Sequence, residues 1–427
     1  QDNCAQVTVE HATPDDVAVG FVEGDGTGTC IDNVANPARL FGTTQFLGVG
    51  AIDIDPSVEQ DEEKGGDDND GDGGDDDDDD DDDDCGGLCF AQGDKFIGVP
   101  LAKYFPAPSS FPYFVTPYTL NSQDTTQLIF WANGTDDSSA PFSRSGFYAF
   151  HLPHDGSITS KDDIGPPTAV AYTAAADGVV LDFVAGGFTD GKSDPSLLVA
   201  MTATHLLYST GGNMVSLKLP CTFASPVPME YDPQTGARIL GPVTHGRTVS
   251  LTVSPADSNV IAVTGWTSVA DNEGAENVWV TTDGGATWQN ITSNLRAASG
   301  VVGKVRPGGL LIVDLLENNA RAVLVGTSNG IQVAFLEGAR GEHAFFTFDP
   351  AQVAWKRFGS EAEFPIVLTA KISYEHYSDT LVAATFGRGI YVMKNGAKKA
   401  LVAAMGGEER KPRVPEKSSA VFFPAQM

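Results

Sequence analysis

The sequence predicts an all-β protein built as a single β-propeller of about seven four-stranded blades, with six as the alternative count. Composition is the first observation: 47 glycines, 25 prolines and only 19% charged residues accompany many short runs of Val, Ile, Phe and Thr. Such runs between turn residues are typical of strands joined by tight connections. A repeat of about 60 residues is the second observation, and a hairpin motif in residues 278–288 is the third.

The repeat is visible in four apolar segments that each end in a threonine or close to one. These threonines are separated by 62, 63 and 58 residues, and they are Thr202, Thr264, Thr327 and Thr385. In the clearest repeats, the apolar segment is preceded by another β-like run and a polar turn. It is followed by a second turn and a further strand. The unit is therefore a meander of about four strands, which is the blade of a propeller. Residues 1–395 are expected to form this one domain.

Earlier blades are expected in the first part of the chain. Residues 128–132 with 146–150 fit one blade, and residues 40–57 with 90–103 can hold one or two more. The strand-like run at residues 6–10 is the candidate to pair with the last blade, because propellers of this kind often close their ring in that way.

An acidic low-complexity insertion, residues 58–89, interrupts this first part. Residues 59–84 hold eighteen carboxylates against one lysine, and ten consecutive aspartates occupy residues 75–84. A block that cannot bury apolar surface and repels itself is expected to be a solvated loop. The alternative is calcium binding, since four aspartates follow the spacing of an EF-hand loop. These metal-ligand candidates are Asp68, Asp70, Asp72 and Asp79.

The hairpin motif begins with two alternating valines and turns at an Asp-Gly-Gly sequence. Its spacing resembles the Asp-box of the sialidase-like (BNR) β-propeller superfamily, to which sialidases and sortilin are related, at Thr281, Asp283, Gly285, Thr287 and Trp288. The resemblance implies a structural role. The aspartate would accept hydrogen bonds from the turn, the glycine would take an unusual φ, and the tryptophan would pack into its blade.

The same resemblance raises the question of sialidase activity. A sialidase would hold the sugar carboxylate with three arginines, and four arginines are spread over different repeats: Arg144, Arg247, Arg306 and Arg388. However, the arginine–isoleucine–proline motif that such enzymes carry near the first blade is missing. Residues 37–40 do not replace it.

A broader glycoside hydrolase would need two carboxylates facing each other across the mouth of the channel. The candidates are Asp182, Asp314 and Glu375, with Asp314 and Glu375 as the first choice. Asp314 is notable because it interrupts an apolar run, so it is either buried, aimed into the channel or turned outward by strand alternation. Trp131 or Trp266 beside two such carboxylates would supply aromatic platforms for a sugar.

Charge and composition argue against a nucleic-acid-binding or membrane-spanning protein and favour a secreted one. A net charge of −31 argues against a nucleic-acid partner, because phosphate backbones are bound by clustered Lys and Arg. No apolar run approaches the length that spans a bilayer. Gln1 in place of a methionine, together with sequons at Asn133 and Asn290, is expected of a secreted, extracellular glycoprotein.

The five cysteines fit an oxidising compartment with two disulfides. The preferred pairs are Cys4 with Cys30 and Cys85 with Cys89, which leaves Cys221 buried or joined to another chain. Other pairings stay open, because connectivity cannot be deduced from sequence.

Residues 396–427 fall outside the repeat and form a mixed-charge tail with an apolar end at 420–424. This tail either packs on its own domain or docks on a neighbouring subunit and drives assembly into an oligomer or polymer.

Since a propeller is a scaffold, its fold does not fix its function. The expected function is a secreted, non-enzymatic propeller for extracellular binding or assembly. Glycans or other extracellular proteins are the expected partners, and Ca²⁺ is the expected cofactor if there is one. A glycoside hydrolase acting on extracellular polysaccharide is the alternative.

Overall fold

The computed structural model describes the backbone of the strands before residue 100 and most of residues 117–406. The gaps in this second part are residues 135–141, 154–164, 175–176, 190–191, 211–212, 224–229, 232–237, 240–248, 267–275, 299–308, 316, 318, 340–345, 360–368, 376–378, 386–389 and 395.

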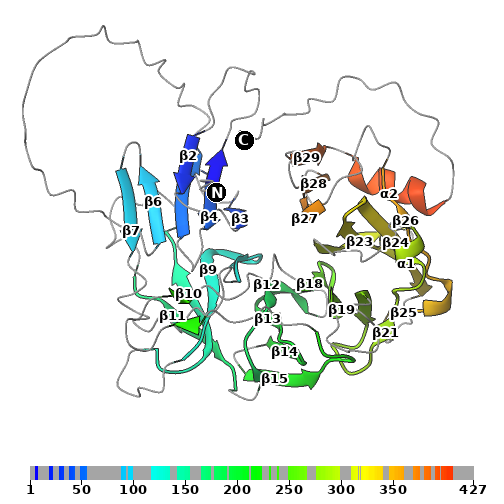
Figure 1. The fold of residues 1–427 in the computed structure, drawn as a ribbon, viewed down its shortest axis with the longest axis horizontal. Helices are drawn as coiled ribbons and strands as arrows, with labels where there is room; N and C mark the ends of the chain where they lie inside the picture. Colours follow the sequence, from blue (N-terminus) through cyan, green and yellow to red (C-terminus); the bar gives the residue numbers. More distant parts are fainter. Residues whose placement is uncertain are drawn as a thin grey trace, which may run out of the picture.

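Five small antiparallel sheets follow one another around a ring, which confirms the mainly β propeller (Figure 1). The first blade contains β8 (Tyr118–Asn121), β9 (Asp124–Ala132), β10 (Gly146–His151) and β11 (Thr168–Tyr172). The second contains β12 (Asp182–Thr189), β13 (Lys192–Met201), β14 (His205–Thr210) and β15 (Asn213–Lys218). The third contains β18 (Val249–Ser254), β19 (Asp257–Trp266), β20 (Glu276–Thr281) and β21 (Gln289–Asn290).

The fourth blade contains β22 (Leu310–Leu315), β23 (Ala320–Thr327), β24 (Gly330–Ala339) and β25 (Thr347–Phe348), and β26 (Lys356–Arg357) also pairs with β24. The fifth contains β27 (Thr369–Glu375), β28 (Thr380–Thr385) and β29 (Ile390–Met393). The first strand of each blade contacts the first strand of the next, so these strands form the inner wall of the ring. The remaining strands follow outward in chain order because antiparallel hairpins connect them.

Among the described residues the hydrophobic core forms four clusters, and each cluster combines side chains of two successive blades. Trp131 of the first blade, for example, packs in one cluster with Phe183 of the second. Burial of apolar surface is the main favourable term in folding, and a single four-stranded sheet has no partner for its faces on its own. Each blade therefore depends on its neighbours for its core.

The repeated threonines mark equivalent positions at or near the ends of the second strands. Thr202 follows β13, and its hydroxyl accepts a hydrogen bond from the His205 N–H at 3.0 Å. Thr327 ends β23, and its hydroxyl donates to the Gly330 carbonyl at 2.8 Å. A short hydroxyl side chain can satisfy backbone groups in a tight turn, as at Thr202 and Thr327, whereas the buried Thr264 hydroxyl has no hydrogen-bond partner among the described residues.

The strands before residue 100 differ from the prediction. β3 (Gly28–Asp32), β4 (Ala38–Thr43), β5 (Val49–Ile54), β6 (Leu88–Gln92) and β7 (Lys95–Val99) form one five-stranded sheet beside β8. β5 and β6 pair in parallel, and the chain between them, residues 55–87, is long enough for the crossover that parallel strands need. Leu88 and Cys89, the last two residues of the segment predicted as an acidic insertion, belong to β6, and the rest of that segment lies outside the described residues.

β1 (Ala5–Val7) pairs with β2 (Val19–Val22), and the strands that the structure describes include no pairing of residues 6–10 with the last blade. The predicted count of seven blades goes beyond the five that the described residues show. Four further elements of the described residues are short. β16 (Glu230–Tyr231) pairs with β17 (Arg238–Ile239), and α1 (Leu295–Ala298) and the short helix η8 (Pro350–Gln352) lie in connections.

Helix α2 (Ala397–Met405) lies in the segment predicted to be a tail. It buries Ala397, Ala400 and Leu401 in the cluster of the fourth and fifth blades. Their i, i+3, i+4 spacing is the pattern of an amphipathic helix and could have indicated it. Among the described residues, no helix has both the length and the apolar character needed to cross a bilayer.

Candidate functional site

Asp314, the first candidate for hydrolytic chemistry, is bound in the seam between the third and fourth blades. Its carboxylate pairs with the Nε of Arg321 at 2.8 Å, and the Ser254 hydroxyl lies 2.9 Å from each carboxylate oxygen. The Ala256 N–H donates to Oδ2 at 3.0 Å. Ser254 and Ala256 belong to the third blade, so this carboxylate joins two blades.

Arg321 is the buried partner in this seam. Its side chain is 2% exposed, and that of Asp314 is 7% exposed. The guanidinium also lies 3.5 Å from the Asp257 carboxylate and 4.2 Å from the centre of the Phe346 ring. A buried cation is stable only with such partners, because leaving water is costly for an isolated charge.

Asp182 has a similar position in the seam between the second and third blades. It is 8% exposed, and its Oδ2 accepts a hydrogen bond from the Leu251 N–H at 2.9 Å. Asp182 and Asp314 therefore lie in different seams and do not form a facing pair. The side chains of Glu375 and Trp266 lie outside the described residues, and Trp131 is 2% exposed within the core, where it cannot stack on a sugar.

The turn of residues 281–288 is held together by its own side chains. The Thr287 N–H and hydroxyl donate to the two oxygens of Asp283 at 2.9 and 2.5 Å, and the Thr281 hydroxyl donates to Oδ1 at 2.7 Å. Gly285 has φ +97°, and a Cβ there would lie 2.7 Å from Leu206 of the second blade. Trp288 packs in the cluster shared by the second and third blades, and the strand after the turn begins one residue later, at Gln289.

Burial would raise the pKa of Asp283, but hydrogen bonds from the Thr287 hydroxyl and N–H, from the Thr281 hydroxyl and from the Ala286 N–H outweigh it. The pKa of this carboxyl is therefore lowered. The turn is therefore a structural unit, in which the Asp283 carboxylate accepts hydrogen bonds from N–H and hydroxyl groups of the same turn.

Both sequon asparagines lie in the described part of the chain. Asn290 is exposed, and its Oδ1 accepts from the Thr292 N–H at 2.8 Å. Asn133 is partly exposed, and its Oδ1 accepts from the Ser145 hydroxyl at 2.9 Å.

Cys221 is a free, half-buried thiol, and burial raises its pKa to about 11 against a smaller opposing effect of Trp279. The side chains of the two predicted disulfides lie outside the part of the chain that the structure describes, although the backbones of Cys30 and Cys89 belong to β3 and β6. The predicted calcium ligands Asp68, Asp70, Asp72 and Asp79 also lie outside it. In the described part of the chain, no three His, Cys, Asp or Glu side chains come together as a metal site would require.

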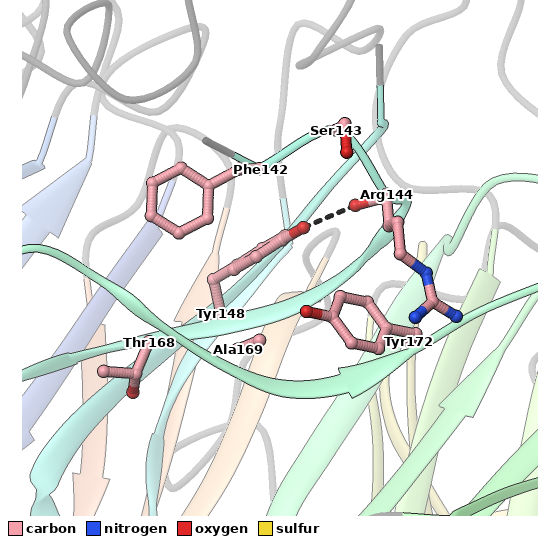
Figure 2. A pocket seen from close by; sticks show the side chains of 7 residues that line it. All are labelled: Phe142, Ser143, Arg144, Tyr148, Thr168, Ala169 and Tyr172. Carbon is pink, nitrogen blue, oxygen red and sulfur yellow. Dashed lines mark hydrogen bonds between the residues drawn. The ribbon is translucent and has the colours of Figure 1, made fainter. Parts of the chain in front are cut away.

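A hollow of about 490 Å³ opens on the outer strands of the first blade (Figure 2). β11, the strand farthest from the ring's inner wall, supplies Thr168, Ala169 and Tyr172, and β10 supplies Tyr148. The turn before β10 supplies Phe142, Ser143 and Arg144. Three aromatic rings and one guanidinium therefore surround the hollow, and Figure 2 shows the Arg144 side chain alongside Tyr172.

The pair of Arg144 and Tyr172 dominates the polar character of this hollow. The guanidinium carbon lies 3.9 Å from the centre of the tyrosine ring, and Tyr172 is 40% exposed. Arg144 was considered for a central site, but the structure places it at the outer edge of its blade. No sequence motif indicates Tyr172 as a site residue. It lies beside Arg144 because β10 and β11 pair in a register that places Gly146 opposite Tyr172.

Tyr148 forms the floor of the hollow and is 1% exposed. Its hydroxyl donates to the Arg144 carbonyl, and its ring meets Phe142 edge-on at 5.1 Å. Burial, with a smaller contribution from Tyr172 against the opposing effect of Arg144, raises the pKa of Tyr148 to about 12. Tyr148 is therefore a neutral hydrogen-bond donor at physiological pH.

Comparison with known proteins leaves the family open: no protein-family model matches the sequence, and no curated protein sequence matches it significantly. The fold and the hollow are thus the basis for inferring function.

Proposed function

We propose that this chain is a secreted, non-enzymatic β-propeller that binds extracellular glycans or proteins. The observation that carries the proposal is the engagement of the two hydrolase candidates whose carboxylates the structure describes. Asp182 and Asp314 are bound to backbone or side-chain partners in seams between blades. A glycosidase would need such carboxylates free to meet a sugar from two sides. The hollow on the first blade instead offers aromatic surface with few polar groups, which is typical of recognition sites.

The test is to incubate the purified chain with a panel of extracellular polysaccharides and to measure binding and release of reducing ends in parallel. We expect binding without release. Release of reducing ends that Glu375→Gln abolishes would establish the hydrolase alternative and overturn the proposal. Asp314→Asn would not serve for this purpose, because it also changes the seam.

We also propose that the chain belongs to the sialidase-like propeller superfamily and that its ring has six or seven blades, with seven preferred. The hydrogen bonds from Thr287 to Asp283 support the family proposal, since they give that turn the role the Asp-box has in the superfamily. The sheet of β3–β7 beside β8 supports more than five blades. A crystal structure of the whole chain would count the blades directly, and a ring closed by five blades would contradict both counts.

Calcium binding by Asp68, Asp70, Asp72 and Asp79 and assembly through residues 396–427 remain parts of this proposal. They rest on the EF-hand-like spacing and on the apolar end of the chain. Sedimentation of protein from its native source with and without a chelator tests them together. Large particles that dissociate on chelation would support calcium-dependent assembly, whereas an unchanged monomer would refute it.

A further inference from the structure

We propose that the hollow on the first blade binds a carboxylate-bearing sugar residue, as in a uronic-acid polysaccharide, with Arg144 on the carboxylate and Tyr172 beside the sugar ring. This inference rests on the proposed binding function and names its site and ligand class.

Charge is the first argument. The chain carries 57 acidic against 26 basic residues, so its overall charge opposes a polyanion, and the proposed contact is a local one between one carboxylate and one guanidinium. Within the described residues, Arg144 has no carboxylate partner, and its guanidinium lies over the Tyr172 ring at 3.9 Å. Stacking uses the flat face of a guanidinium and leaves the N–H groups at its edge to bind an anion. A planar carboxylate matches that edge with two parallel hydrogen bonds.

The position of Arg144 is fixed by its neighbours. The Tyr148 hydroxyl donates to its carbonyl, and the next residue, Ser145, is held on two sides. The Ser145 hydroxyl donates to Asn133 and accepts from the Gly134 N–H, each at 2.9 Å, and the Ser145 carbonyl accepts from the Thr173 N–H at 3.0 Å. A binding group that is already held in place loses little conformational entropy when its ligand arrives.

The aromatic residues favour a sugar over a small inorganic anion. Tyr172 is exposed and Phe142 lies at the rim, so an apolar face of the ligand can be covered next to the charge. Phe142 has φ +148°, an uncommon value for a residue with a side chain, and its ring is braced edge-on against Tyr148. A sugar acid presents one carboxylate and one weakly polar ring face, which matches this combination.

The experiment uses isothermal titration of the full chain with oligogalacturonate and with the same oligosaccharide after reduction of its carboxyl groups. We expect the acidic form to bind and the reduced form to bind at least about tenfold more weakly, the effect of one charge-assisted contact. Arg144→Ala should weaken binding of the acidic form about tenfold or more, and Tyr172→Ala should weaken both forms. Arg144→Lys should also weaken it, because lysine keeps the charge but not the paired donors.

Lys192→Ala is the matched control, since Lys192 is an exposed cation on the neighbouring blade and should leave binding unchanged. Thermal unfolding midpoints equal to that of the unmodified chain would show that the variants are folded. No measurable binding of the acidic oligosaccharide, equal binding of the acidic and reduced forms, or full binding by Arg144→Ala would each overturn the inference. Binding of other extracellular ligands would then leave the proposed function standing, whereas cleavage of the polysaccharides without stable binding would overturn that function as well.

Discussion

Arg321 is a charged residue that the fold has made part of its interior. With its side chain 2% exposed, it depends on Asp314 at 2.8 Å and on Asp257 at 3.5 Å to stay ionised in the seam. Removing one partner of a buried pair leaves the other charge uncompensated, which typically costs about 3–5 kcal/mol. We therefore expect Arg321→Met to lower the free energy of unfolding by about 3 kcal/mol or more, measured by chemical denaturation at neutral pH.

The matched control is Lys192→Met. Lys192 is exposed at the start of β13, and substitutions at exposed positions usually change the free energy of unfolding by less than about 0.5 kcal/mol. Equal stability of the two variants would mean that the pair in the seam contributes nothing measurable.

At this scale the sequence indicates which residue is unusual but not what it binds. Asp314 is conspicuous because it interrupts an apolar run, and burial is one of the three orientations that its sequence context allows. Its partners could not be predicted. Arg321 lies directly opposite it only because β22 pairs with β23 in that register, and Ser254 comes from the preceding blade. The same applies to Arg144 and Tyr172, which the register of β10 and β11 brings together.

Among the elements, the turn of residues 281–288 gives a prediction about pH. The pKa of Asp283 is lowered in the folded chain, so the stability it adds is full above the pKa of an unfolded aspartate, about 3.9, and is lost as the pH falls through the lowered folded value. We expect the unmodified chain to lose more stability between pH 5 and pH 2, in round numbers, than Asp283→Asn does. Denaturation curves across that range measure the difference, and parallel curves would contradict it. At neutral pH, Asp283→Ala should cost about 1–2 kcal/mol.

The bend in β12 gives a second prediction for an element. Gly186 has φ +74°, and a Cβ there would lie 2.2 Å from the Asn121 side-chain oxygen. Gly178 has a similar φ of +84° but open space around it. Gly178→Ala should therefore show the backbone cost alone, about 1–2 kcal/mol. Gly186→Ala should cost clearly more, because the seam between the first two blades must also open. Thermal or chemical unfolding of the two variants would compare them, and equal losses would show that the contact with Asn121 is not limiting.

Prediction of elements from sequence succeeds where the pattern is local. The strands around the repeated threonines follow from alternation and turn residues, and they lie where they were expected, as in β22 and β23. The pairing of β1 with β2 and the parallel pairing of β5 with β6 depend on partners that no local pattern specifies. Helix α2 was missed because short alanine-rich segments after a strand repeat carry little signal beyond their spacing.

For the whole molecule, the division of the core among pairs of blades implies that the blades unfold together. Asn121 is fully buried in the first seam, where its side-chain N–H donates to the Pro195 carbonyl at 2.7 Å and its oxygen accepts from the Gln123 and Asp124 N–H groups. Asn121→Ala would leave that carbonyl and those N–H groups without their side-chain partner, at a cost of about 2 kcal/mol.

If each blade depends on its neighbours, the stability lost through Asn121→Ala at the first seam should also destabilise the blades at the other end of the described ring. Hydrogen exchange measured by mass spectrometry under mildly denaturing conditions should then speed up in β23 of the fourth blade by about the same factor as in β13 of the second. Lys218→Ala, which removes an exposed side chain from β15, should change neither. Faster exchange confined to the first two blades would mean that neighbouring blades contribute independently, and the shared clusters would then stabilise each pair of blades without linking the ring into one cooperative unit.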